Sequence, residues 1–270
     1  MIRFGILGAA RIAPRALIYP CLDEPRAEVR AVAARSPQRA VEFARQHGIP
    51  LALESYDALV NHPEIDAVYI ALPISSHCDW TLRALAAGKH VLCEKSFASN
   101  AAEAEVMASA ARAGGFVAMD AFHYRYHPLF LRAREIVASG GIGAILDIEA
   151  VFRTPIANPD DIRLDYRCGG GVTMDIGCYP ISWARHISGE EPQVVDARAE
   201  TGPPGVDVVL SATLAFASGA QARITGDMRP DCAFDASLTV TGSDGRLHLK
   251  NPLLPQTGHA LELDAGGEST

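Results

Sequence analysis

The sequence predicts an α/β protein with two domains, in which a doubly wound parallel sheet precedes an α+β domain with a largely antiparallel sheet. Short apolar runs alternate with helical segments as far as residue 121, and a glycine turn directly follows the first run. After residue 190, closely spaced strand patterns are joined by turns such as Ser218-Gly219. A meander of this kind is typical of an antiparallel sheet covered by helices on one face.

The elements of the first domain follow from apolar runs bounded by helix-start and helix-stop residues. Ser36-Pro37 predicts a helix start with an N-cap and a first-turn proline, and Gly48 predicts the helix end. Asn100 and Glu103 predict a capped start for a later helix. The expected strands are 2–7, 28–34, 66–72, a run from Val91 and 116–118, and the expected helices are 37–46, 55–61, 76–87 and 100–113.

The turn after the first strand spans residues 8–13, Gly-Ala-Ala-Arg-Ile-Ala. It matches the G-x-G-x-x-G/A pattern, except that Ala10 stands where a second glycine lets the backbone approach a pyrophosphate. Alone, this match fits a structural turn equally well. With the alternating strands and helices that follow, it predicts a Rossmann dinucleotide-binding domain with Gly8, Ala10, Arg11 and Ile12 at the cofactor.

The end of the second strand bears on the choice of cofactor. NAD sites carry an acid there for the ribose hydroxyl, but this chain has none between Val29 and Gln38. Arg35 could instead pair with a 2′-phosphate, assisted by Ser36 and by Arg39 on the first helical turn. A solvated arginine is the alternative interpretation. We expect NADP as the cofactor, with NAD as the alternative.

A lysine at another strand end is the first catalytic candidate. The apolar run from Val91 ends in Glu94-Lys95-Ser96, and ligands of open parallel sheets bind beyond the carboxyl ends of strands. By itself this stretch favours a solvated charge pair in a loop. However, Lys95 is one of three lysines in a chain rich in arginine, which favours a compact, titratable ammonium group at this position.

The texture of the sequence changes after Ala118, and we expect domains at residues 1–121 and 122–270. His123 and His127 have the spacing of a metal-binding pair, but no third ligand is evident nearby, so we expect packing or substrate contact and no metal. The expected elements are a helix at 129–139, strands at 145–153, 194–199, 206–216, 220–228, 234–241 and 246–249, and a helix ending near 187.

Asp175 and Tyr179 follow a triple glycine and are the second catalytic candidates. Their spacing of four places them on one face if the segment is helical. Pro180 removes a helical hydrogen bond, so a bend or a helix start near Tyr179 is an alternative. A helix-start acid and a core aromatic residue would be the purely structural interpretation.

Bulk properties restrict the function further. The formal net charge of −8 argues against nucleic acid or an anionic membrane as a partner. No apolar run approaches the ~18 residues of a membrane span, and the N-terminus lacks the features of a signal peptide. The six cysteines are scattered, without zinc spacing, and predict buried thiols in a reducing cytoplasm.

Five segments, in their order and spacing, resemble the Gfo/Idh/MocA oxidoreductases, named for glucose–fructose oxidoreductase and inositol dehydrogenase. Ser96 stands where the family usually has proline. Tyr179, where many members have histidine, is similar to the glucose–fructose oxidoreductase and dimeric dihydrodiol dehydrogenase branch. The resemblance covers essentially the whole chain, although the family usually continues beyond residue 270. The segments are 8–13, 72–77, 94–96, 125–128 and 170–179.

The resemblance implies an NAD(P)-dependent oxidoreductase that transfers a hydride between the nicotinamide and a sugar, polyol or related cyclic diol or ketone. Tyr179 could exchange the proton once a nearby cation lowers its pKa, Lys95 could supply that cation, and Asp175 could orient the substrate hydroxyl or Lys95. The implied contacts are cofactor contacts from Leu72, Pro73, His77, Glu94 and Lys95, and substrate contacts from Tyr124 and Arg125.

A cofactor-binding sensor without turnover is the alternative function, because a fold does not determine an activity. We expect a homodimer or homotetramer, since residues 206–214 are more apolar than a solvated sheet face would be and the resemblance implies pairing of sheet faces. The expected partner is a small molecule, not nucleic acid or membrane, and the expected location is the cytoplasm.

Overall fold

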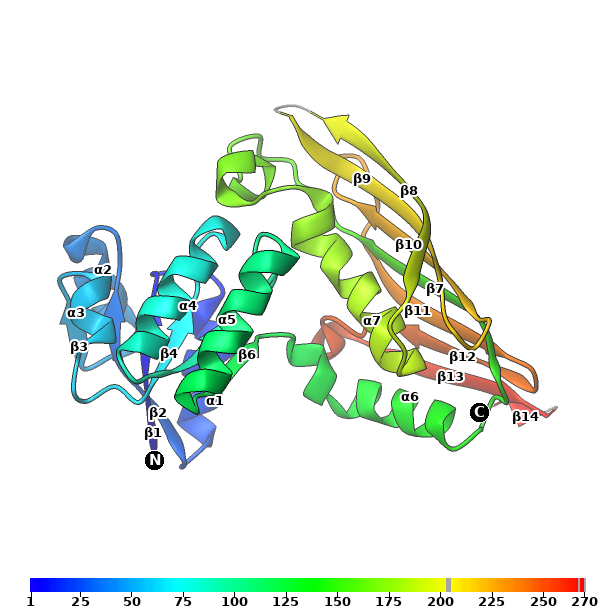
Figure 1. Cartoon of the computed structure of the whole chain (residues 1–270), viewed down its shortest axis with the longest axis horizontal. Coiled ribbons are helices and arrows are strands. Elements are labelled where there is room, and N and C mark those ends of the chain that lie inside the picture. The colour runs from blue at the N-terminus through cyan, green and yellow to red at the C-terminus, as the bar shows by residue number, and fades with distance from the viewer. Residues whose placement is uncertain (203–204, 267, 270) are drawn as a thin grey trace. The chain divides into compact units, whose positions relative to one another are not determined.

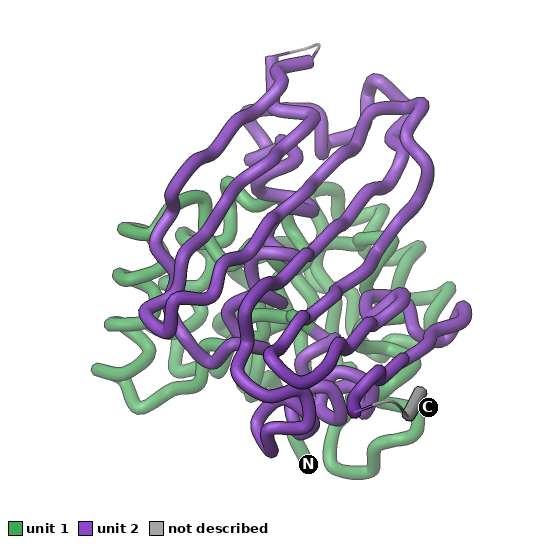
Figure 2. The backbone as a smooth tube through the Cα atoms, turned by 90° about the vertical axis from the view of Figure 1, so that its right-hand side faces the viewer, with its two compact units in different colours: residues 1–122 green, residues 123–270 purple. Residues whose placement is uncertain are grey.

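The computed structural model describes residues 1–202, 205–266 and 268–269. The chain divides into two compact units, the first comprising residues 1–122 and the second beginning at His123 (Figure 2). Each unit contains one sheet with its own helices. Both sheets had been expected from the sequence, and the α/β class is confirmed.

The first unit is built on a six-stranded sheet with the order β3-β2-β1-β4-β5-β6, in which all neighbouring strands are parallel (Figure 1). This is the doubly wound order of dinucleotide-binding folds. Strands covered by helices on both faces are apolar throughout, and all four residues of β4 are buried. The strands are β1 (Ile2–Leu7), β2 (Ala27–Ala33), β3 (Leu51–Leu53), β4 (Ala67–Ile70), β5 (His90–Cys93) and β6 (Ala118–Asp120).

Two helices of this unit begin directly after the polar residues that the sequence indicated, Ser36 and Asn100. Asn100 caps α5 by accepting from the Glu103 amide (2.9 Å), while Glu103 accepts from the Ser99 amide. Ser36 stands before α2, but its side chain makes no capping hydrogen bond. The helices are α1 (Tyr19–Asp23), α2 (Pro37–His47), α3 (Tyr56–Val60), α4 (His77–Ala86) and α5 (Ala101–Gly114), with a π-helical turn at Pro14–Ile18.

Two details of this unit differ from expectation. The strand expected at 116–118 begins later, at Ala118, because the Phe116 amide still bonds to the Ala111 carbonyl of α5 (2.9 Å). The short strand β3 was not expected, since three residues are too few to establish a pattern.

The register of the parallel strands brings their carboxyl ends to one edge. Ala33, Leu7, Ile70, Cys93 and Asp120 stand side by side across β2, β1, β4, β5 and β6. The residues that follow each strand therefore line a common edge, and this carboxyl edge is where such sheets bind ligands.

The second unit has an eight-stranded sheet with the order β14-β13-β12-β11-β7-β10-β9-β8. The simple meander expected from the sequence is wrong, because β7 lies between β11 and β10 and pairs with β10 in parallel. The other pairs are antiparallel. The strands are β7 (Ile145–Arg153), β8 (Gln193–Gly202), β9 (Val206–Ala215), β10 (Gln221–Asp227), β11 (Asp235–Gly242), β12 (Gly245–Lys250), β13 (Ala260–Ala265) and β14 (Glu268–Ser269).

One face of this sheet carries the helices α6 (Pro128–Ala138) and α7 (Cys178–Ser188), which lie on the same side of it in Figure 1. Trp183 of α7 contacts Phe152 of β7 (ring centroids 6.4 Å apart). Leu210 and Leu214 are buried, whereas Ser211 between them is exposed. The apolar character of β9 therefore serves the covered face, contrary to our expectation of an apolar open face.

Neither a membrane-spanning helix nor a metal-binding cluster is present among residues 1–202, 205–266 and 268–269. No helix there is both long and apolar enough to cross a membrane. No group of three or more His, Cys, Asp or Glu side chains there is arranged to hold a metal ion.

Candidate active site

Gly8 closes the end of β1 against the end of β4. Its φ of +103° lies in the region that favours glycine, and a Cβ at this position would lie 2.5 Å from the Ala71 carbonyl oxygen. The Gly8 amide donates to the Ala33 carbonyl at the end of β2 (2.9 Å). Glycine is therefore required where these three strand ends meet. In the turn that follows, Ala10 is half-buried, and Arg11 and Ile12 are exposed.

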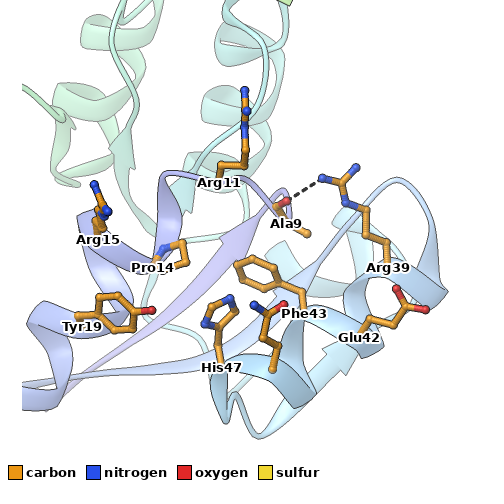
Figure 3. Close-up of a pocket in the computed structure, with 10 residues that line it drawn as sticks. Ala9, Arg11, Pro14, Arg15, Tyr19, Arg39, Glu42, Phe43 and His47 are labelled. Atoms are coloured by element: carbon orange, nitrogen blue, oxygen red, sulfur yellow. Dashed lines mark hydrogen bonds between the residues drawn. The ribbon is translucent and has the colours of Figure 1, made fainter. Parts of the chain in front are cut away.

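Arginines surround this turn. Arg39 on α2 donates to the Ala9 carbonyl (3.0 Å) and ties the turn to the helix (Figure 3). An open pocket of about 500 Å³ lies beside the bond, with Arg11 and Arg15 among its lining residues. Arg35 and Ser36 are exposed at the end of β2, and the Arg35 guanidinium has no hydrogen-bond or ion-pair partner within the described chain.

His77 connects two strand ends below the surface. Its Nδ1 lies 2.8 Å from the Ser96 carbonyl oxygen after β5, and its Nε2 lies 2.9 Å from the Leu72 carbonyl oxygen after β4. The side chain is fully buried, and burial lowers the pKa of His77. This placement argues against direct cofactor contact by the imidazole, although His77 does hold Leu72 and Pro73 in place.

Glu94 and Lys95 lie at the end of β5. The Glu94 amide donates to the Ile70 carbonyl (3.0 Å), and its carboxylate accepts a short hydrogen bond from the buried Tyr69 hydroxyl. Glu94 is therefore fixed by the sheet below it and is not a freely solvated loop residue. Lys95 follows at the carboxyl edge, half-buried, and the Lys95–Ser96 peptide bond is cis.

Asp175 and Tyr179 belong to the second unit and share one helical segment. A π-helical turn at Thr173–Gly177 runs directly into α7, which begins at Cys178. The segment is therefore helical on both sides of Tyr179, and its α-helical part does start near Tyr179, which the sequence left open as an alternative. The wider turn accommodates the bond that proline cannot make. Asp175 is 8% exposed and Tyr179 is 7% exposed. Their spacing of four places both on one side of the segment.

The surroundings of the two side chains differ. The Tyr179 ring packs against Phe152 of β7 (ring centroids 5.6 Å apart) and against Tyr124 (6.3 Å). Asp175 lies near a cation, with its Oδ2 4.0 Å from Nε of Arg163. An acid and a phenol in nearly water-free surroundings can exchange or direct a proton with little competition from solvent.

The two substrate-binding candidates are placed differently from each other. Tyr124 is fully buried, and its hydroxyl donates to Ser182 Oγ of α7 (2.7 Å). This position in the core argues against direct substrate contact by Tyr124. Arg125 is half-buried, with its guanidinium 5.9 Å from the centre of the Tyr126 ring.

The neighbouring histidines have local structural contacts. His123 Nε2 lies 2.7 Å from the Leu253 carbonyl oxygen. His127 caps α6 by accepting from the Leu129 amide (3.2 Å), and Pro128 occupies the first turn of that helix, where proline fits. Pro128 therefore begins α6, one residue before the start of the helix expected at 129–139.

The structure brings the sequence-predicted residues together in two groups. Gly8, Arg35, Leu72, Glu94 and Lys95 meet at the carboxyl edge of the first sheet through the strand register. Asp175 and Tyr179 meet on the helical segment of the second unit. Our sequence reasoning overlooked Arg163 beside Asp175, although two successive Asp-x-Arg repeats, 161–163 and 165–167, marked the segment in the sequence.

Comparisons with known proteins agree with both units. Residues 2–122 match the family model described as "Oxidoreductase family, NAD-binding Rossmann fold", and residues 130–248 match the model described as "GFO/IDH/MocA C-terminal domain". The chain is 39% identical over 249 residues to D-xylose 1-dehydrogenase (NADP(+)) 2 of Haloferax volcanii, covering 90% of this chain and 74% of the relative.

A further sequence relative and a solved crystal structure are also similar to this chain. Trans-1,2-dihydrobenzene-1,2-diol dehydrogenase of Xenopus laevis is 32% identical over 252 residues, covering 92% of this chain and 74% of that protein. The crystal structure of KijD10, a 3-ketoreductase from Actinomadura kijaniata in complex with NADP and TDP-benzene, superimposes with a TM-score of 0.92. Its sequence is 33% identical, and the match covers 100% of this chain and 83% of that one.

The doubly wound sheet, its glycine turn and the second mixed sheet define a dinucleotide-binding oxidoreductase with a separate C-terminal domain. More specifically, the chain belongs to the GFO/IDH/MocA family of oxidoreductases. It is an NAD(P)-dependent enzyme of the dehydrogenase and reductase class. The relatives are named for D-xylose, for a dTDP-linked keto sugar and for a dihydrobenzene diol.

Proposed function

We propose that this protein is an NADP(H)-dependent oxidoreductase that interconverts a hydroxyl and a keto group of a sugar, polyol or related cyclic diol. The observation that carries the cofactor choice is the exposed guanidinium of Arg35 at the end of β2, where an NAD site would place an acid. The Haloferax relative is named for NADP(+) and for a free sugar, D-xylose, which supports both parts of the proposal.

The strand edge fits this cofactor in shape and charge. Gly8 allows the tight turn after β1, and we assign pyrophosphate contacts to this turn with Ala10, Arg11 and Ile12. Beside Arg35, the Ser36 side chain leaves the first amides of α2 without a cap, and an anion is stabilised there. We assign backbone contacts to Leu72, Pro73, Glu94 and Lys95, and a phosphate contact to Arg39.

Proton transfer, charge stabilisation and substrate orientation are assigned to different side chains. The bound nicotinamide supplies or accepts the hydride. We assign proton exchange with the substrate oxygen to Tyr179, and stabilisation of charge on that oxygen to the ammonium group of Lys95. Asp175 orients the substrate hydroxyl by accepting its hydrogen bond, and Arg125 is the remaining candidate for substrate contact.

The cofactor proposal is tested by titrating NADP(H) and NAD(H) into the wild type and Arg35→Asp in a calorimeter. A charge-assisted pair with the phosphate contributes about 1.5–3 kcal/mol, so we expect NADP(H) to bind roughly tenfold to a hundredfold more tightly than NAD(H). Arg35→Asp should reverse the preference, because a carboxylate repels phosphate and accepts from the ribose hydroxyl.

Arg45→Asp is the matched control, since it makes the same charge change at the exposed far end of α2. The substrate class is tested in the same preparation, by following NADP⁺ reduction with D-xylose, other aldoses, polyols and a cyclic trans-diol. Equal or tighter NAD(H) binding by the wild type would contradict the cofactor assignment. Cofactor binding without turnover of any of these compounds would favour the alternative function, a cofactor-binding sensor. Membership of this family of oxidoreductases does not support that alternative.

The assembly and location belong to the same proposal. We propose a homodimer or homotetramer that acts on a small molecule, without nucleic acid or membrane as a partner. The cytoplasm is proposed as the location because none of the six cysteines forms a disulfide bond in the described part of the chain, as expected in a reducing compartment.

A further inference from the structure

Two successive turns between β7 and α7 have the same internal hydrogen bonds. In Asp161-Ile162-Arg163, the aspartate accepts from the arginine amide (3.1 Å), from Nε (2.9 Å) and from Nη2 (3.0 Å). In Asp165-Tyr166-Arg167, the corresponding distances are 2.9, 3.1 and 2.9 Å. In both turns a planar guanidinium is therefore held by a bidentate carboxylate pair.

The two arginines differ in what lies beyond this pair. The Arg167 side chain is 89% exposed. The Arg163 side chain is 36% exposed, its partner Asp161 is 9% exposed, and its Nε lies 4.0 Å from Oδ2 of Asp175. Charges interact more strongly where water is excluded, so the cation of Arg163 acts on Asp175 while the cation of Arg167 is screened.

Backbone contacts hold Arg163 at the start of the helical segment that carries Asp175. The Gly171 amide donates to the Arg163 carbonyl (2.9 Å), and the Asp175 amide donates to the Gly171 carbonyl (2.9 Å). A Cβ on Gly170 would lie 2.6 Å from the Arg163 carbonyl oxygen, so the triple glycine allows this close approach. The distance between Arg163 and Asp175 is thus set by the main chain.

Other charged groups come from the strands packed against the segment. On β9, Asp207 accepts from the Thr173 amide (2.9 Å). At the end of β10, Asp227 pairs with Arg229 (2.7 Å). Burial acts to raise the pKa of Asp227, but the hydrogen bonds from Arg229 and the charges of Arg229 and Arg153 together lower it. For Arg163, the hydrogen bond with Asp161 raises the pKa and the charge of Asp175 adds to this, although burial acts oppositely.

We infer that Arg163 is a positioning residue that holds the Asp175 carboxylate oriented for catalysis, and that Asp161 fixes Arg163 in this role. The inference rests on the proposed catalytic function of Asp175. Without the Arg163 cation 4.0 Å away, the Asp175 side chain would lose the electrostatic contact that directs its carboxylate toward a substrate hydroxyl. Arg163 acts on the reaction through Asp175, without touching the reacting atoms.

The first test compares Arg163→Met, Arg163→Lys and the matched control Arg167→Met with the best substrate of the panel. Arg163→Met should lower kcat roughly tenfold to a hundredfold, with KM changed less than kcat and with cofactor Kd unchanged. Arg163→Lys should restore part of the loss, because it returns the charge without the bidentate fork. Arg167→Met should stay within about twofold of the wild type.

Asp175→Asn separates this inference from the function on which it rests. If Arg163 acts through Asp175, adding Arg163→Met to Asp175→Asn should cause no further loss of kcat. An equal loss of kcat in both backgrounds, or a raised cofactor Kd in Arg163→Met, would overturn the role of Arg163. Full activity of Asp175→Asn would overturn the catalytic assignment itself.

A measurement that needs no turnover covers variants that lose activity or stability. In protein labelled with carboxyl-¹³C aspartate, the Asp175 resonance is identified by its loss in Asp175→Asn. The chemical shift of this resonance should change in Arg163→Met, which removes the cation, and in Arg163→Lys, which alters the cation's geometry. It should stay the same in Arg167→Met. An Asp175 resonance that stays in place in both Arg163 variants would refute the coupling, whatever the kinetics show.

Discussion

At the scale of single residues, the three lysines of the chain have distinct environments. Lys89 donates to the carbonyl groups of His62 (3.0 Å) and Ile65 (2.7 Å), so its ammonium group stabilises the backbone of the first unit. Lys250 is exposed at the end of β12. Lys95 stands at the carboxyl edge of the parallel sheet. Of the three, its position suits the chemistry, as the sequence suggested from the rarity of lysine.

We predict that Lys95→Met lowers kcat by roughly a hundredfold or more, because the developing charge on the substrate oxygen loses its cation. Tyr179→Phe should act similarly and change the pH profile of kcat. The measurements are steady-state kinetics and calorimetric cofactor titration, and cofactor Kd should remain close to the wild-type value. Near-normal turnover in Lys95→Met would refute the assigned role, and Lys250→Met is the control.

At the scale of elements, the helical segment that carries Asp175 and Tyr179 is anchored from outside. Asp207 of β9 accepts from both the amide and the hydroxyl of Thr173. A Cβ on Gly171 would lie 2.1 Å from Oδ1 of Asp207, so glycine is required for this contact. A neighbouring strand therefore provides the cap that the helix start lacks in its own sequence.

We predict that Asp207→Ala lowers the free energy of unfolding by about 1–2 kcal/mol, through the loss of this cap. For a chain of this size, the shift corresponds to a fall of roughly 2–8 °C in the thermal unfolding midpoint. The measurement is thermal unfolding followed by circular dichroism. Asp160→Ala, at an exposed position, should leave the midpoint unchanged. An unchanged midpoint in Asp207→Ala would show that the cap is dispensable.

At the scale of the whole molecule, the open face of the second sheet bears on assembly. Strand register places Ser211, Thr213 and Thr225 on the face opposite Leu210 and Leu214. Threonine and serine side chains can hydrogen-bond to one another across neighbouring strands, which gives this face a polar surface. The proposed assembly therefore requires a mixed polar surface, in place of the apolar one that residues 206–214 suggested.

We predict that light scattering at micromolar concentration gives at least twice the mass of one chain. Thr213→Arg should reduce this mass to that of a monomer, because a two-fold interface brings two copies of the new charge together. Ala102→Arg, on an exposed position of α5, is the control and should leave the mass unchanged. A monomeric wild type would rule out the assembly.

The sequence by itself determined the parallel sheet, because a strand buried on both faces must be apolar and its helices must start and stop at particular residues. Asn100 starts α5 and Gly48 ends α2, as predicted. Gly8 could also be assigned from sequence, since few other residues tolerate its φ. These features are determined by residues only a few positions apart in the chain, so they can be predicted without knowledge of the tertiary structure.

Tertiary structure alone decided features that depend on distant segments. The parallel pairing of β7 with β10 depends on segments about seventy residues apart, and no local pattern encodes it. The burial of Tyr124, the fixed position of His77 and the approach of Arg163 to Asp175 likewise arise from packing. Sequence could identify which residues have suitable chemistry, but only the packed chain shows which of them remain exposed, which are buried, and which charges lie side by side.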